Sequence, residues 1–100
     1  MYKDKTWEEQ ANKQVVEWRR AFHQAPELSA HEEQTAIKIM EVLQQIGLEP
    51  QKAANCNGVT ALIKGALPGA TIALRADMDA LPIQESLDLP YKSQNEGVMH

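Results

Sequence analysis

The sequence has 100 residues, 43% of them hydrophobic, which suffices for one domain with its own core. Ten lysines and arginines against fourteen aspartates and glutamates give a net charge of −4 without a basic stripe, which argues against nucleic acid as a partner. No apolar run approaches the roughly 20 residues of a membrane span, and the charged N-terminus lacks the apolar segment of a secretion signal. Cys56 is the only cysteine and has no neighbouring histidine, so we expect a structural thiol in a cytoplasmic protein.

The first predicted element is an amphipathic helix over residues 7–22. Its apolar residues recur at steps of three or four, as one face of a helix requires: Trp7, Ala11, Val15, Trp18 and Phe22. The helix should end before Pro26, because the residue before a proline avoids the helical region. His23 falls in the last turn, where we expect a structural residue, with a functional role as the less favoured alternative.

A second helix is predicted over residues 30–46. Ser29 and Glu32 have the spacing of a capping box at its start. Gly47 has the usual position of a glycine that ends a helix. The chain therefore opens with two helices joined by a short segment at residues 26–29, which we call the elbow.

The central part of the chain predicts a sheet. Residues 48–53 are expected to be extended, residues 59–64 are β-branched and apolar, and residues 71–75 are expected to form a short buried strand. The glycine- and proline-containing residues 65–70 suit a hairpin connection between the last two. Two helices followed by strands of a mixed sheet, covered by helices, predict an α/β protein.

The strongest candidate for chemistry is the end of the last predicted strand. Arg75, Asp77 and Asp79 follow one another within five residues, and Pro82 then prevents regular continuation. Burying an unpaired carboxylate is costly, so the two aspartates need Arg75, a metal ion, backbone donors or water as partners. Open α/β sheets place their chemistry at such strand ends. On spacing alone, a solvated turn with an Arg–Asp pair is the favoured interpretation.

Several motifs, in this order, resemble the opening part of one enzyme family. They cover residues 19–29, 33–36, 58–59, 74–85, 90–91 and 97–100, and the string Arg-Ala-Asp-Met-Asp-Ala-Leu-Pro at residues 75–82 is the most specific. The family is that of metal-dependent amidohydrolases, which includes hippurate hydrolases, N-acyl-L-amino-acid amidohydrolases and plant hydrolases of auxin–amino-acid conjugates. It is similar to the aminoacylases and zinc carboxypeptidase-like enzymes of the same clan.

The resemblance implies hydrolysis of the amide bond of N-acyl amino acids. Two divalent metal ions, manganese or zinc, would activate water, and a glutamate would act as general base. The implied partner is a small N-acyl amino acid, with no nucleic acid and no membrane, and the intact enzyme would be a homodimer. The implied fold is the N-terminal portion of a zinc-peptidase-like catalytic domain over residues 1–100, with the inserted dimerisation domain outside this chain.

The resemblance also implies roles for three residues. In related zinc peptidases, the segment that matches residues 77–79 carries a histidine ligand and then an aspartate that orients it. Asp77 stands in place of that histidine and is a weak candidate ligand, whereas Asp79 keeps the orienting role. His100 belongs to the matching motif, is expected to flank the metal site, and is a second weak candidate ligand.

In the family, the Cys and His ligands and the base glutamate follow after the position of His100. We therefore expect an N-terminal fragment that is inactive alone, with most metal ligands beyond it. The alternative is a stand-alone binding or regulatory module derived from such an enzyme. A module of that kind should end in a capped element and avoid open sheet edges.

Overall fold

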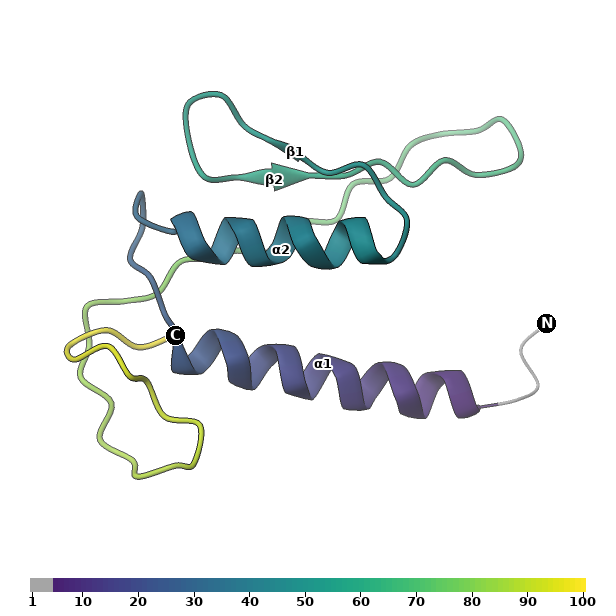
Figure 1. Cartoon of the computed structure of the whole chain (residues 1–100). Coiled ribbons are helices and arrows are strands. Elements are labelled where there is room, and N and C mark those ends of the chain that lie inside the picture. The colour runs from purple at the N-terminus through teal and green to yellow at the C-terminus, as the bar shows by residue number, and fades with distance from the viewer. Residues whose placement is uncertain (1–4) are drawn as a thin grey trace.

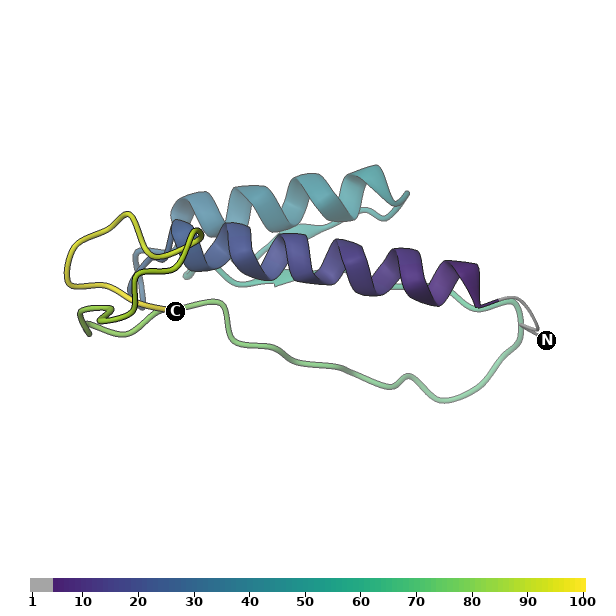
Figure 2. The ribbon, with the colours of Figure 1, turned by 90° about the horizontal axis from the view of Figure 1, so that it is seen from below.

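A computed structural model of the chain describes residues 5–100, which form two helices and one pair of strands. The helices α1 (Thr6–Gln24) and α2 (Glu33–Gln45) run side by side in opposite directions, and the strands β1 (Gln51–Lys52) and β2 (Val59–Thr60) lie beyond α2 (Figure 1). After β2, residues 61–79 form an extended segment, which we call the excursion, and the chain then returns to the C-terminal end of α1 (Figure 2). The α/β fold class is confirmed. Within the described residues, no helix is long and apolar enough to cross a membrane.

The predicted first helix is confirmed as α1. It extends slightly beyond residues 7–22 and ends at Gln24, before Ala25 and Pro26. Glu8 and Glu9 occupy its first turn and His23 its last, which suits the charge distribution of a helix dipole. No residue of α1 is buried. The apolar pattern thus predicted the helix correctly, although Trp18 and Phe22 are only half-buried and the earlier apolar residues Trp7 and Val15 are exposed.

The predicted second helix is confirmed as α2, but its predicted capping box is wrong. The N-cap is Glu32, and its side chain makes no capping hydrogen bond. Ser29 lies instead in a turn that is closed by the N–H of His31 and the carbonyl oxygen of Leu28, 2.9 Å apart. The turn delays the start of the helix by three residues relative to the prediction. Gly47, with φ +91°, follows the helix as predicted.

The strands are shorter than the sequence suggests. β1 and β2 are antiparallel, with Gln51 opposite Thr60, and both contact α2. Only the first two residues of the predicted strand 59–64 are in a strand. The predicted buried strand 71–75 is wrong: it has no strand assignment, and Ile72 and Leu74 are 86% and 98% exposed. A strand needs a partner for its backbone groups, and no described residue pairs with this segment.

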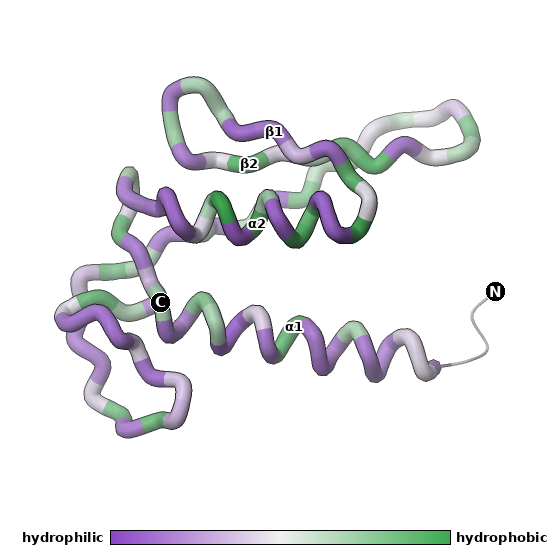
Figure 3. The backbone as a smooth tube through the Cα atoms, in the orientation of Figure 1, coloured by the Kyte–Doolittle hydropathy of each residue, from purple (hydrophilic) through white to green (hydrophobic). Residues whose placement is uncertain are grey.

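The small core lies where the elbow, the start of α2 and the returning chain meet. The buried residues within the described range are Pro26, Thr35, Ala36 and Ala80. Apolar residues are also frequent outside this core, particularly in the excursion after β2 (Figure 3). Most side chains of that excursion are exposed, so the buried residues are concentrated at the elbow and the segments that contact it.

Candidate functional site

The carboxylate of Glu27, in the elbow between the helices, caps the N-terminus of α2. Its Oε1 accepts hydrogen bonds from the backbone N–H and the hydroxyl of Thr35, both at 2.6 Å, and its Oε2 accepts the N–H of Gln34 at 3.3 Å. These N–H groups belong to the first turn, where helices lack internal acceptors. Burial acts to raise the pKa of Glu27, but the hydrogen bonds from Thr35 and Gln34 outweigh it and lower this pKa.

The backbone of the elbow holds the segment that follows the predicted strand end. The carbonyl oxygen of Glu27 accepts the N–H of Ala80 at 2.7 Å, and Leu28 forms a parallel bridge with Ala80. Ala80 is itself buried. Asp79 is therefore attached to the elbow through its immediate neighbour.

A second pairing fixes the same segment from the C-terminal side. Leu81 and Met99 exchange backbone hydrogen bonds of 2.9 and 3.0 Å in an antiparallel bridge. In antiparallel pairing, this register places Ala80 opposite His100. The half-buried Asp79 and the exposed His100 thus belong to one edge of the molecule, although 20 residues separate them along the chain.

Asp77 and Asp79 both line an open cavity of about 620 Å³. The other lining residues come from the turn before α2, the loop between the strands and the predicted strand end: Ser29, Ala30, Glu32, Cys56, Asn57, Gly58, Arg75, Ala76 and Met78. The Oε1 atom of Glu32 is buried without a hydrogen-bond partner among the described residues. A buried carboxylate oxygen without a donor is unfavourable, so this atom of Glu32 is a polar group still to be satisfied next to the cavity.

Arg75 and Asp77 pair with each other, which is what the spacing alone favoured. Their side chains lie 2.9 Å apart, and they are 90% and 73% exposed. An exposed ion pair of this kind contributes at most about 1 kcal/mol to stability. Asp77 therefore lies in a solvated, irregular segment, while Asp79 is next to Ala80, which is hydrogen-bonded to the elbow.

The described residues do not form a metal centre by themselves. Within residues 5–100, no group of three histidine, cysteine, aspartate or glutamate side chains could hold a metal ion. Asp77 and His100, the weak candidate ligands, are accordingly not brought together with a third ligand. Cys56 is exposed beside the cavity, and its Sγ lies 3.4 Å from the backbone N–H of Gly58.

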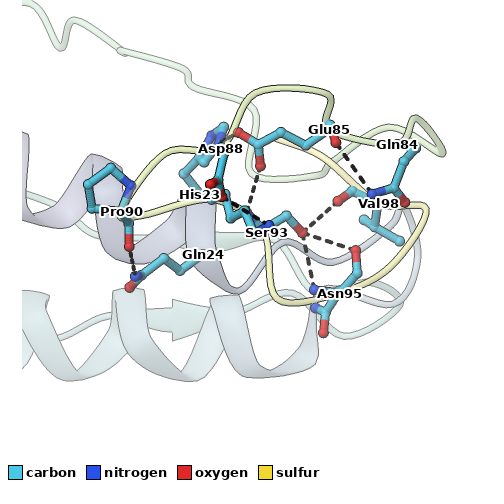
Figure 4. A network of polar contacts seen from close by, with 10 residues as sticks. His23, Gln24, Gln84, Glu85, Asp88, Pro90, Ser93, Asn95 and Val98 are labelled. Carbon is cyan, nitrogen blue, oxygen red and sulfur yellow. Dashed lines mark hydrogen bonds and ion pairs between the residues drawn. The ribbon is translucent and has the colours of Figure 1, made fainter.

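A polar network that the sequence analysis missed lies at the C-terminal end of α1 (Figure 4). The ring Nε2 of His23 donates to Oε1 of Glu85 at 2.6 Å. The other oxygen of Glu85 accepts the N–H of Ser93, also at 2.6 Å. His23 and Glu85 each stand inside a motif of the family resemblance, and that was the available signal, because 62 residues separate them.

The network stabilises the charged form of Glu85. The hydrogen bond from His23 is the largest cause that lowers the pKa of Glu85, followed by the hydrogen bond from Ser93. Burial opposes this shift, and the positive charges of His23 and Lys92 add to it. The carboxylate is therefore ionised in the folded chain at neutral pH.

Known proteins resemble this chain closely. No family model matches it. The chain is 49% identical over 87 residues to YhaA of Bacillus subtilis, named as an amidohydrolase, and 46% identical over 86 residues to an N-acyl-L-amino acid amidohydrolase of Geobacillus stearothermophilus. These matches cover 87% and 86% of this chain but only 22% and 23% of the relatives, so the chain spans about a fifth of their length.

A solved structure extends the comparison to three dimensions. The crystal structure of Bacillus subtilis YXEP, described as a dinuclear metal binding peptidase from the M20 family, matches with a TM-score of 0.82 and 42% identity. The match covers 88% of this chain and 25% of that protein. The predicted resemblance to amidohydrolases and the expected α/β arrangement are both confirmed.

Proposed function

We propose that this chain is the N-terminal portion of the catalytic domain of a hydrolase that cleaves the amide bond of N-acyl amino acids. The observation that carries the proposal is the 42% identity to a dinuclear metal binding peptidase over 88% of the chain, together with relatives named as amidohydrolases. The substrate class follows the name of the Geobacillus relative.

Two divalent metal ions, manganese or zinc, belong to this proposal. When bound, they supply a polarised carbonyl group and a water of lowered pKa. The described residues provide no complete ligand set, so we place most ligands outside residues 5–100. We assign the orienting role to Asp79. It is half-buried, and its neighbour Ala80 is hydrogen-bonded to Glu27 in the elbow. A carboxylate held in this way can fix the orientation of a side chain that binds a metal ion.

The remaining features of the proposal concern the whole protein. We place it in the cytoplasm as a homodimer whose dimer contacts come from an inserted domain outside residues 1–100. Residues 1–100 alone should be inactive, because residues 5–100 bring no three candidate ligands together and no general base is assigned among them. Their contribution is to hold Asp79 beside the cavity that Asp77 and Glu32 also line.

The test uses the full-length protein that carries this segment, purified without metal. Adding manganese or zinc should produce release of free amino acid from N-acetyl amino acids, and a chelator should abolish it. Residues 1–100 assayed in parallel should release nothing above the buffer blank. A full-length protein that stays inactive with either metal but binds N-acyl amino acids would support the binding-module alternative instead.

A further inference from the structure

The ion pair between His23 and Glu85 differs from the other ion pairs within residues 5–100. Its side chains are only 18% and 6% exposed, and it joins the last turn of α1 to a segment far along the chain. The Arg75–Asp77 and Lys92–Asp88 pairs are both exposed and join near neighbours. Partial burial strengthens a hydrogen-bonded charge pair and raises the penalty for leaving one partner alone.

Glu85 carries this contact onward through residues 84–99, which we call the C-terminal loop. Its second oxygen accepts the N–H of Ser93, and the hydroxyl of Ser93 lies 2.7 Å from the carbonyl oxygen of Val98 (Figure 4). Val98 precedes Met99, which forms the bridge with Leu81. A continuous series of hydrogen bonds therefore runs from α1 to the residue before this bridge.

Further contacts dock the C-terminal loop on the end of α1 and on the elbow. The N–H of Gln94 donates to the carbonyl oxygen of Gln24, and Nδ2 of Asn95 donates to that of Pro26, both at 2.8 Å. The rings of Tyr91 and His23 pack edge-to-face, with centroids 5.9 Å apart. These contacts, together with the hydrogen bond from His23 to Glu85, hold the C-terminal loop on α1 and the elbow.

We propose that His23 and Glu85 are positioning residues for the hydrolase site, an inference that rests on the proposed function. The pair holds the C-terminal loop on α1, the loop holds Met99 against Leu81, and Leu81 lies two residues from Asp79. Neither residue lines the cavity that Asp79 lines. Their action on the site passes through the backbone of residues 79–81.

The first readout is hydrogen exchange in the full-length protein, which requires no activity. His23→Leu removes the donor, whereas His23→Gln keeps an N–H that can reach the carboxylate. We expect the exchange of backbone amides in residues 93–99 to rise about tenfold in His23→Leu, as for loss of a hydrogen bond to a charged group, and to return toward the wild-type rate in His23→Gln. Asp88→Asn, which changes an exposed pair on the same loop, is the matched control and should leave exchange unchanged.

The second readout is the split between kcat and KM for an N-acetyl amino acid. His23→Leu should lower kcat by about 10–100-fold with KM nearly unchanged, and His23→Gln should restore most of the loss. Exchange that stays at the wild-type rate in His23→Leu would overturn the proposal, as would faster exchange with an unchanged kcat. If His23→Leu does not fold, Glu85→Gln decides by the same criteria, because it can still accept from Ser93. A wild-type protein without activity would refute the proposed function, while exchange alone would still test the pair.

Discussion

The backbone N–H of Ala80 donates to the carbonyl oxygen of Glu27 at 2.7 Å, while the carboxylate of the same glutamate caps α2. One residue of the elbow therefore fixes both the start of a helix and the segment that carries Asp79. This arrangement explains how an elbow of few residues positions a candidate site that lies about 50 residues further along the chain.

The capping role of Glu27 predicts a loss of stability in Glu27→Ala. Removing a helix cap typically costs about 1 kcal/mol, and up to about 2, in free energy of unfolding. Urea denaturation of the full-length protein measures the change. Glu33→Ala is the matched control, because Glu33 lies in the first turn of α2 and is exposed. Equal effects of the two substitutions would contradict a specific cap at Glu27.

Ala30 predicts a stabilising substitution. It adopts φ +69°, a left-handed conformation that costs a residue with a side chain roughly 1–2 kcal/mol relative to glycine. Ala30→Gly should therefore raise the free energy of unfolding by about 1 kcal/mol, after allowing for the greater freedom of glycine in the unfolded chain. The melting temperature checks this expectation. A lower melting temperature for Ala30→Gly would show that the turn is not strained at this position.

The exposed excursion predicts the behaviour of residues 1–100 as an isolated chain. Ile72 and Leu74 are almost fully exposed, and their segment has no backbone partner among the described residues. Unpaired, apolar, extended segments promote association between chains. We expect the isolated chain to be partly unfolded or to aggregate, measured by light scattering and thermal unfolding. Replacing both residues by lysine should reduce the association, and a monodisperse monomer with a sharp, reversible melting transition would contradict the expectation.

The helices could be predicted from the sequence more accurately than the strands, for physical reasons. The helix α1 follows from the periodicity of residues such as Val15 and Trp18, and the end of α2 follows from Gly47, because both signals are local. The strand at residues 71–75 was predicted wrongly, since apolar composition does not say whether a pairing partner is present.

The candidate site was predictable only where its residues are close in sequence. A pair between Arg75 and one of the two aspartates was predicted, and Arg75 pairs with Asp77. The sequence analysis assigned the cap of α2 to Ser29, but the capping residue is Glu27, two residues earlier. Glu27 is not at the N-cap position, so its spacing from the helix matches no known capping motif. The contact between His23 and Glu85 depends on the tertiary fold and has no local signature.

The lowered pKa of Glu85 predicts how the docking of the C-terminal loop on α1 depends on pH. A carboxyl group whose pKa is lower in the folded state stabilises that state above its ordinary pKa of 4.5, and the contribution is lost as pH falls through the lower, folded value. Hydrogen-exchange protection of residues 93–99, corrected for the intrinsic pH dependence of exchange, should hold from neutral pH to about 4.5 and then decline. His23 on α1 and Lys92 on the loop are the cations that act on this carboxylate.

Glu85→Gln separates this effect from general acid unfolding. The glutamine cannot ionise, so the part of the decline below pH 4.5 that belongs to Glu85 should disappear. Glu27, whose pKa is also lowered, remains in this variant and reports on the acid sensitivity of the cap. If the hydrogen-exchange protection of residues 93–99 depends on pH in Glu85→Gln as it does in the wild type, the docking of the loop does not depend on this charge.

The substitution Asp79→Asn in the full-length protein tests the central claim most directly, with activity measured against metal concentration. If Asp79 orients a metal ligand, Asn keeps its shape but removes its charge, and activity should fall about 10–100-fold with the melting temperature unchanged. An aspartate that only stabilises a turn would tolerate Asn, which makes the same local hydrogen bonds. Asp88→Asn, at a side chain that is 95% exposed, is the control and should keep wild-type activity. A large loss in Asp79→Asn is the predicted result, and wild-type activity of this variant at limiting metal would contradict the account.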